Sequence, residues 1–136
     1  MMPHVRESVE EHFAPLVADE KFMDYQPKLI NGDLVPYHII FDRGKRQING
    51  IIDFGTAGIG DPAADFSCMI YNYGESFLAK MMKYYPEIES ALDRARFWAG
   101  TLELQWALAG ARTKNYWWNL VHLGGARDAK PIGTDI

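Results

Sequence analysis

The sequence has little cysteine, no long apolar run and no excess of positive charge, and each shortage excludes a class of protein. The single cysteine, Cys68, rules out an internal disulfide and fits a reducing compartment. No apolar run approaches the ~20 residues of a membrane span, and no basic-then-apolar signal pattern opens the chain. The net charge of -4 argues against nucleic acid or an anionic membrane, since both bind basic patches. We therefore expect a cytoplasmic protein with neither partner.

What is present is typical of one globular domain. The 136 residues are 48% hydrophobic and 24% charged, and they contain no internal repeat or low-complexity segment. A chain of this length can bury roughly two thirds of its unfolded surface, which is enough for a core. We expect residues 1–124 to form the domain and residues 125–136, which contain "DAKPIGTDI", to be a frayed tail.

The hydrophobic periodicity predicts mostly helices with a small β region, an α+β fold class. The turn "DRGKRQ" separates two β-rich segments and suggests a hairpin, and the following "GTAGIGDPAAD" is too rich in glycine to be regular. Predicted strands cover residues 29–30, 38–41 and 47–54. Predicted helices cover residues 3–17, 63–73, 75–85, about 88–109 and 116–123.

Two carboxylates in the β region have unusual surroundings. Asp33 lies between two apolar runs in "LINGDLVPYHIIFD", and Asp53 ends "INGIIDF" just before a glycine turn at Gly55. Antiparallel pairing of the two hairpin strands should bring Asp33, His38 and Asp53 to the same end. Mg²⁺ binds one or two carboxylates plus substrate phosphates, and a glycine turn lets a phosphate approach the backbone closely. The pattern indicates a metal and phosphate site at this end of the hairpin.

The stretches "NGDLVPYHIIFD" and "GIIDFGTAGIGDPAADF" resemble the aminoglycoside phosphotransferase family, small-molecule kinases with the protein-kinase-like fold. That family has His-Gly-Asp, four residues, Asn, a strand pair, Asp-Phe-Gly, then Gly-Asp-Pro with a second Asp three residues after the Pro. The resemblance covers about residues 5–124. It implies the mostly helical C-terminal lobe of that fold, with a hairpin that carries the catalytic loop and Asp-Phe-Gly.

The resemblance also implies a role for each matching residue. Asp65 should be a buried support that accepts hydrogen bonds from the backbone of residues 31–33. The implied co-substrates are ATP or GTP with Mg²⁺, and a small-molecule alcohol as acceptor. The expected roles are Asp33 as the catalytic carboxylate, Asp53 and His38 as metal ligands, Gly55 in the nucleotide and phosphate loop, and Asn31 and Asp65 as structural support.

The sequence departs from the family pattern in several places. Asn31 replaces the usual histidine, His38 replaces the usual asparagine, and Thr56 stands where many aminoglycoside kinases have an acid. Nothing before Asn31 supplies the glycine-rich strand pair, the strand lysine or its helical glutamate partner. We therefore expect a C-terminal lobe without the N-terminal nucleotide-binding lobe, inactive by itself. The alternative is a non-catalytic module that self-associates, most simply as a homodimer, through the exposed inter-lobe face.

Less specific interpretations remain open for the same residues. Asp33 and Asp53 could cap turns, which is the usual work of a loop aspartate, and His38 could be a core histidine with satisfied hydrogen bonds. Asp61 precedes a proline-led helix and is expected to cap it. Glu103 could lie at a solvated helix edge or reach a cationic substrate.

Overall fold

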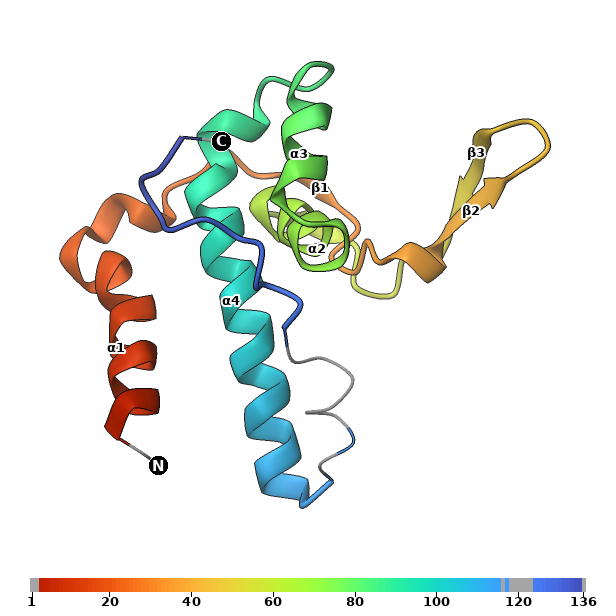
Figure 1. The fold of residues 1–136 in the computed structure, drawn as a ribbon. Helices are drawn as coiled ribbons and strands as arrows, with labels where there is room; N and C mark the ends of the chain where they lie inside the picture. The colour runs from red at the N-terminus through yellow and green to blue at the C-terminus, as the bar shows by residue number, and fades with distance from the viewer. Residues whose placement is uncertain (1–2, 116, 118–123, 136) are drawn as a thin grey trace.

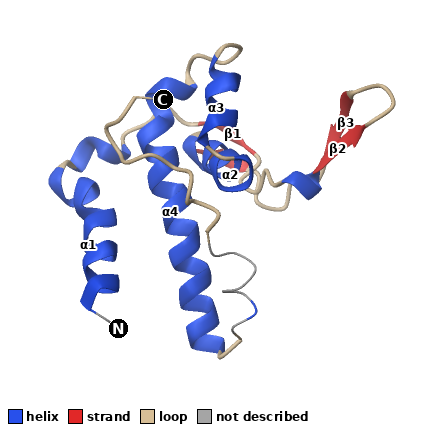
Figure 2. Cartoon of the chain, viewed as in Figure 1, coloured by secondary structure: helices blue, strands red, loops and turns tan. Residues whose placement is uncertain are grey.

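The computed structural model describes residues 3–115, 117 and 124–135. Small antiparallel sheets lie between an N-terminal helix and a group of packed helices, which confirms the α+β prediction (Figures 1 and 2). In chain order the elements are α1 (Pro3–Ala18), the 3₁₀ turn η1 (Glu20–Met23), β1 (Lys28–Ile30), the 3₁₀ turn η2 (Pro36–His38), β2 (Ile39–Asp42), β3 (Gln47–Ile51), β4 (Gly58–Gly60), α2 (Ala63–Tyr73), α3 (Glu75–Met82) and α4 (Ile88–Thr113).

The core lies where α2 packs against α3 and the N-terminal half of α4 (Figure 1). Ile70, Leu78 and Ile88 come from these three helices and are fully buried. Burial of such a side chain contributes about 1.5–3 kcal/mol. Leu34 and Ile39, from the loop and strand that surround His38, pack against the same core. The segment that carries Asp33 is therefore anchored to the helices.

The helix boundaries follow local signals in most places. α2 covers the predicted residues 63–73, because Pro62 precedes it and Gly74, with φ of 79°, ends it. α3 ends at Met82 rather than Tyr85, and Pro86 disfavours a helical conformation for Tyr85 in the turn that follows. α4 extends to Thr113, beyond the predicted end, and Lys114 caps it with a φ of 54°. None of the described helices is both long and apolar enough to cross a membrane.

Strand β4 corrects the expectation that the glycine-rich segment has no regular structure. It pairs antiparallel with β1, with Leu29 opposite Ile59 and Ile30 opposite Gly58. Gly60 opposes Lys28, and a Cβ atom on Gly60 would lie 2.9 Å from Cδ1 of Ile30. The Ile30 side chain lies close to the Gly60 backbone and would have to shift if residue 60 carried a Cβ, so glycine at this position suits the pairing.

The hairpin of β2 and β3 projects away from the helices (Figure 1). Ile39 pairs with Ile51, and the amide of Ile52 donates to the His38 carbonyl at 2.9 Å. β3 ends at Ile51, earlier than predicted, because the chain takes a positive φ at Asp53. Several apolar side chains on and beside the ribbon are exposed: Tyr37, Ile40, Phe41, Ile48, Ile51, Ile52 and Phe54.

The described part of the C-terminal segment, residues 124–135, is bonded to the fold, contrary to the expectation of a frayed tail. Arg96 ion-pairs with the Glu75 carboxylate inside the fold and donates to the Thr134 carbonyl at 2.6 Å. The amide of Lys130 donates to the same carboxylate at 2.7 Å. A buried carboxylate requires several donors, and the tail supplies one of them. The predicted helix over residues 116–123 lies, except for Trp117, outside the described residues.

Candidate functional site

The chain between β1 and β2, residues 31–38, is held by α2; we refer to it as the Asp33 loop. Gly32 has a φ of 80°, a conformation that favours glycine. Asp65, in the first turn of α2, accepts hydrogen bonds from the amides of Asn31 at 2.9 Å and Gly32 at 2.8 Å. The predicted contacts are confirmed. The prediction that Asp65 is buried is wrong, because the residue is only half-buried.

Asp53 opens a tight turn, residues 53–57, which we refer to as the Asp53 turn. Its φ of 59° lies in the left-handed region, which costs a non-glycine residue about 1–3 kcal/mol. Its Oδ1 accepts from the Gly55 amide at 3.3 Å, and its carbonyl accepts from Nδ2 of Asn31 at 3.2 Å. Strained backbone that the surroundings hold in place is common at functional sites. The phosphate-binding role of Gly55 stays a prediction, and its amide contacts Asp53 here.

His38 lies between the two aspartates. Its Nδ1 is 2.8 Å from the Asp33 carbonyl oxygen, and because a carbonyl only accepts, Nδ1 carries the proton and donates. In the neutral ring Nε2 then has a lone pair, and this atom lies 3.5 Å from Oδ2 of Asp53. Nδ1 is also 3.6 Å from Oδ2 of Asp33. The structure thus brings together the three residues that the sequence singled out.

The side chains of His38, Asp33 and Asp53 differ in solvent exposure. The His38 side chain is 12% exposed, whereas those of Asp33 and Asp53 are 46% and 59% exposed. The imidazole is held by packing and by its bond to the loop backbone. Both carboxylates can therefore meet a ligand from solvent while the ring between them keeps its orientation.

The donor set of His38 and Asp53 fits a divalent cation. A lone pair and a carboxylate oxygen, both acceptors, face each other at 3.5 Å, and a cation between them would satisfy both. Donation of the other ring nitrogen to a backbone carbonyl is the usual support of a metal-binding histidine. Among the described residues, no group of three or more His, Cys, Asp or Glu side chains could hold a metal. The pair therefore suits a cation whose remaining ligands are water and phosphate, as is common for Mg²⁺.

Asn31 and Thr56 join the Asp33 loop to the Asp53 turn. Oδ1 of Asn31 accepts from the Asp33 amide at 3.1 Å, while its Nδ2 reaches the Asp53 carbonyl. The Thr56 hydroxyl donates to the Asn31 carbonyl at 3.0 Å. The supporting role expected of Asn31 agrees with these bonds. The sequence interpretation missed the contact of Thr56, because it considered that residue only as a missing acid, and no local pattern marks a threonine for such a contact.

Asp61 and Glu103 hold other parts of the fold. Asp61 accepts from the Ala63 amide at 3.0 Å, which agrees with the expected cap, and it also ion-pairs with Arg94 at 2.9 Å. Glu103 accepts from the Ala126 amide at 2.8 Å. Glu103 therefore binds the C-terminal segment, a role that neither interpretation from the sequence included.

Cys68 lies under the Asp33 loop and is not a reactive thiol. It is 7% exposed, and burial, opposed in part by a hydrogen bond from the Leu34 backbone, raises the pKa of its thiol to about 11. A thiol with so high a pKa carries almost no thiolate at neutral pH, and the thiolate is the nucleophile. Cys68 therefore contributes packing between α2 and the loop.

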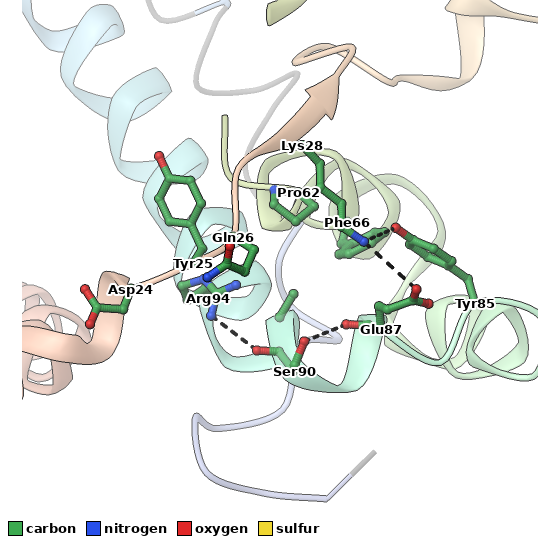
Figure 3. A pocket seen from close by; sticks show the side chains of 11 residues that line it. Asp24, Tyr25, Gln26, Lys28, Pro62, Phe66, Tyr85, Glu87, Ser90 and Arg94 are labelled. Atoms are coloured by element: carbon green, nitrogen blue, oxygen red, sulfur yellow. Dashed lines mark hydrogen bonds and ion pairs between the residues drawn. The ribbon is translucent and has the colours of Figure 1, made fainter. Parts of the chain in front are cut away.

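A pocket of about 580 Å³ lies at the far end of β1 from Asp33 (Figure 3). Figure 3 shows Nζ of Lys28 meeting the Tyr85 hydroxyl and Glu87 on one side, with Arg94 and Tyr25 on the other. The Lys28–Tyr85 distance is 3.0 Å, and this bond raises the pKa of Lys28. Asp33, His38 and Asp53 do not line this pocket, so it is separate from the site between the aspartates.

Comparison with families of known proteins gives one match over most of the chain. The family model described as "Phosphotransferase enzyme family" matches residues 3–98, which include the Asp33 loop and the Asp53 turn. Viomycin phosphotransferase from Streptomyces vinaceus is 29% identical over 87 residues, which cover 62% of this chain and 30% of that protein. The uncharacterized protein YcbJ from Bacillus subtilis (strain 168) is 34% identical over 77 residues, 57% of this chain and 25% of that protein.

Solved structures share the fold over nearly the whole chain. The GDP complex of wild-type aminoglycoside 2'-phosphotransferase-IIIa superposes with a TM-score of 0.79 at 26% identity, over 95% of this chain and 44% of that one. A related structure contains GDP and kanamycin, with a TM-score of 0.79 at 25% identity. This chain spans less than half of the length of each of these relatives.

Proposed function

Because the chain belongs to the phosphotransferase enzyme family, as its motifs predicted, we propose that it carries the catalytic half of a nucleotide-dependent small-molecule kinase. The transferred group is the terminal phosphoryl of ATP or GTP, and the acceptor is the hydroxyl of a small molecule. The observation that supports this most is His38 between Asp33 and Asp53, bonded to the loop of one and facing the carboxylate of the other. The GDP in the solved relatives supports a nucleotide as co-substrate.

Asp33 is proposed to receive the acceptor hydroxyl. Phosphoryl transfer has a loose transition state, so positioning and charge neutralisation dominate its catalysis. A carboxylate within hydrogen-bond reach orients the hydroxyl and takes its proton as the bond to phosphorus forms. The half-exposed Asp33 carboxylate is accessible to such an acceptor, while the two amides bound to Asp65 keep its loop in place.

Asp53 and His38 are proposed to hold the Mg²⁺ that accompanies the nucleotide. When bound, the cation neutralises phosphate charge and orients the transferred group. The chain contributes Oδ2 of Asp53 and Nε2 of His38, and the phosphates and water complete the coordination. The positive φ of Asp53 keeps this carboxylate at the end of the hairpin.

The acceptor is proposed to be an alcohol-bearing small molecule. The relatives act on antibiotics according to their names, viomycin and the aminoglycosides. Thr56 is uncharged at the position after Asp53-Phe54-Gly55, so the Asp53 turn adds no further acid for a polycation. The acceptor hydroxyl must meet the Asp33 carboxylate for the proposed transfer.

Turnover is proposed to require a second, nucleotide-binding part of the protein. It would correspond to the portion of the relatives that this chain does not cover. Kinase-like catalysis uses a glycine-rich loop and a strand lysine over the phosphates, and residues 1–30 carry no such pattern. By itself the chain should bind nucleotide weakly and turn over little. The proposed place of action is the reducing cytoplasm, where the lone buried thiol of Cys68 stays reduced.

Self-association is a second candidate property, favoured by the exposed hairpin. Ile40, Phe41 and Ile48 are 44%, 53% and 61% exposed on a ribbon that projects away from the helices (Figure 1). A two-stranded ribbon is marginally stable alone, and exposed apolar patches bind partners. We expect sedimentation of the purified chain to show a dimer that Ile48→Lys weakens. A monomer at all concentrations would exclude this property and leave the catalytic proposal intact.

The catalytic proposal is tested by metal–nucleotide binding. Mn²⁺ with ADP or GDP should broaden the NMR signals of His38 and of the Asp53 turn in the purified chain, and Asp53→Asn should abolish the effect. Asp24→Asn, an exposed carboxylate outside the site, is the matched control. Broadening that is the same in Asp53→Asn would refute the proposal. If the coding sequence continues upstream, the longer protein should phosphorylate alcohols and lose this activity on Asp33→Asn.

A further inference from the structure

The relative position of Asp33 and Asp53 depends on few contacts. The ladder between β1 and β4 ends at Ile30 and Gly58, before it reaches either aspartate. Beyond that ladder, the Ile52 amide donates to the His38 carbonyl at 2.9 Å, and side chains carry the other connections between the Asp33 loop and the Asp53 turn. They are the contacts of His38, the bond from Asn31 to the Asp53 carbonyl, and the bond from Thr56 to the Asn31 carbonyl.

Asn31 and Thr56 form a reciprocal pair. The side chain of Asn31 binds the backbone of the Asp53 turn, and the side chain of Thr56 binds the backbone of the Asp33 loop. Asn31 is 8% exposed, so its carbonyl depends on a protein donor. The hydroxyl of Thr56 supplies that donor at 3.0 Å. Together the two hydrogen bonds connect the Asp33 loop and the Asp53 turn in both directions.

Thr56 is exposed to solvent, and the Asp33 loop lies close against one side of it. A Cβ atom on Gly32 would lie 2.9 Å from the backbone oxygen of Thr56 and 3.1 Å from its hydroxyl oxygen. The Asp33 loop therefore touches the threonine directly beside the hydrogen bond. A branched side chain of the same shape without the hydroxyl would face the Asn31 carbonyl with a methyl group, which cannot donate.

We propose that Thr56 is a positioning residue, whose hydroxyl sets the separation of the Asp53 and His38 ligands from Asp33 by holding the Asn31 carbonyl. This inference rests on the proposed metal site and goes beyond it, because Thr56 itself contacts neither metal nor substrate. Loss of the hydroxyl releases the Asp53 turn from the Asp33 loop. The ligand pair then loses its fixed geometry while each ligand remains present.

The test is the affinity of the purified chain for Mn²⁺, alone and with ADP, measured by broadening of the His38 ring signals. Thr56→Val removes the hydroxyl at constant shape, and Thr56→Ser keeps it. Loss of a supporting contact weakens metal binding about 10–100-fold, so the valine variant should bind at least about tenfold more weakly. The serine variant should restore most of the affinity. Thr113→Val removes a similar hydroxyl-to-carbonyl bond on α4, far from the site, and should change nothing.

The outcomes separate this inference from the function on which it rests. Unchanged Mn²⁺ affinity in folded Thr56→Val, or failure of Thr56→Ser to restore it, would overturn the positioning role and leave the metal site standing. Absence of Mn²⁺ binding by the unsubstituted chain would overturn both. Should the valine variant not fold, Thr56→Ala decides the question. Water can enter beside the smaller side chain, and a folded alanine variant with full affinity would refute the role.

Discussion

Nε2 of His38 lies 3.5 Å from Oδ2 of Asp53, and the opposite nitrogen of the same ring donates to the Asp33 carbonyl at 2.8 Å. One side chain thus connects the backbone beside one carboxylate to the second carboxylate. The bond to the carbonyl decides which nitrogen keeps a lone pair. The ring is therefore oriented before any ligand arrives, and such preorganisation is what a metal ligand needs.

The identity of the ligand at position 38 should decide which cation the site prefers. Imidazole suits transition metals, while Mg²⁺ prefers oxygen ligands. We expect His38→Asn to lower the affinity for Mn²⁺ relative to Mg²⁺ by about tenfold, because the amide offers oxygen instead of nitrogen. Competition between the two ions, followed by the electron paramagnetic resonance signal of free Mn²⁺, measures the ratio. An equal loss for both ions would show that His38 acts on the fold alone.

Asp65 should stabilise the fold through the two amides that it accepts from the Asp33 loop. Asp65→Asn replaces one acceptor oxygen with a donor and leaves the amide of Asn31 or Gly32 without its partner. Such a loss costs about 1–3 kcal/mol, and urea unfolding measures it. The control Asp24→Asn changes an exposed carboxylate in the segment before β1. Equal stability of the two variants would contradict the supporting role of Asp65.

The pair of Glu75 and Arg96 should be the main attachment of the C-terminal segment. Their side chains are 3% and 1% exposed, and desolvation of Glu75 is outweighed by Arg96 and the Lys130 amide, which lower the pKa of its carboxyl. Glu75→Gln leaves the Arg96 charge without this partner, which costs about 3–5 kcal/mol for a buried pair. Faster hydrogen exchange at residues 130–134 should accompany the loss of stability.

The control for this pair is Asp93, which also binds Arg96 but is 41% exposed. Asp93 also accepts from the Gly133 amide at 2.9 Å, so Asp93→Asn weakens a second contact of the tail. Because its carboxylate is partly solvated, Asp93→Asn should still destabilise the protein less than Glu75→Gln. Comparable losses in the two variants, or an undisturbed tail in Glu75→Gln, would show that other contacts hold the segment.

His12 should make the fold less stable in mild acid. Its ring stacks on Phe97 at 4.9 Å, and because the Thr101 hydroxyl donates to the Phe97 carbonyl, Nε2 of His12 must donate to Thr101. Burial lowers the pKa of His12, and a backbone hydrogen bond to Phe97 opposes the shift only in part. As the pH falls from 6.5 through the folded pKa, the unfolded chain binds the proton first and stability decreases.

The measurement for His12 is the free energy of unfolding at pH 7.5 and at pH 5.5, about one unit to either side of the ordinary histidine pKa. His12→Gln removes the titrating group, so the variant should lose less stability than the unsubstituted chain over this interval. Parallel losses would show that His12 titrates alike in the folded and unfolded states.

Local sequence determined much of this molecule. Apolar residues at helical spacing predicted α2 within its observed bounds, because Pro62 and Gly74 act on the backbone beside them. The order of Asp33, His38 and Asp53 around a hairpin predicted their meeting, since antiparallel pairing places strand ends together. These features need only neighbouring residues or one turn.

Tertiary structure decided the features whose partners are distant in sequence. The glycines of β4 form a strand because β1, about thirty residues earlier, presents a free edge. The tail is ordered because the amide of Lys130 donates to the buried carboxylate of Glu75. Thr56 contributes because its hydroxyl donates to the Asn31 carbonyl. Periodicity and turn residues report how a segment behaves locally. They do not show which buried polar group a distant side chain will satisfy, because only folding brings the two groups together.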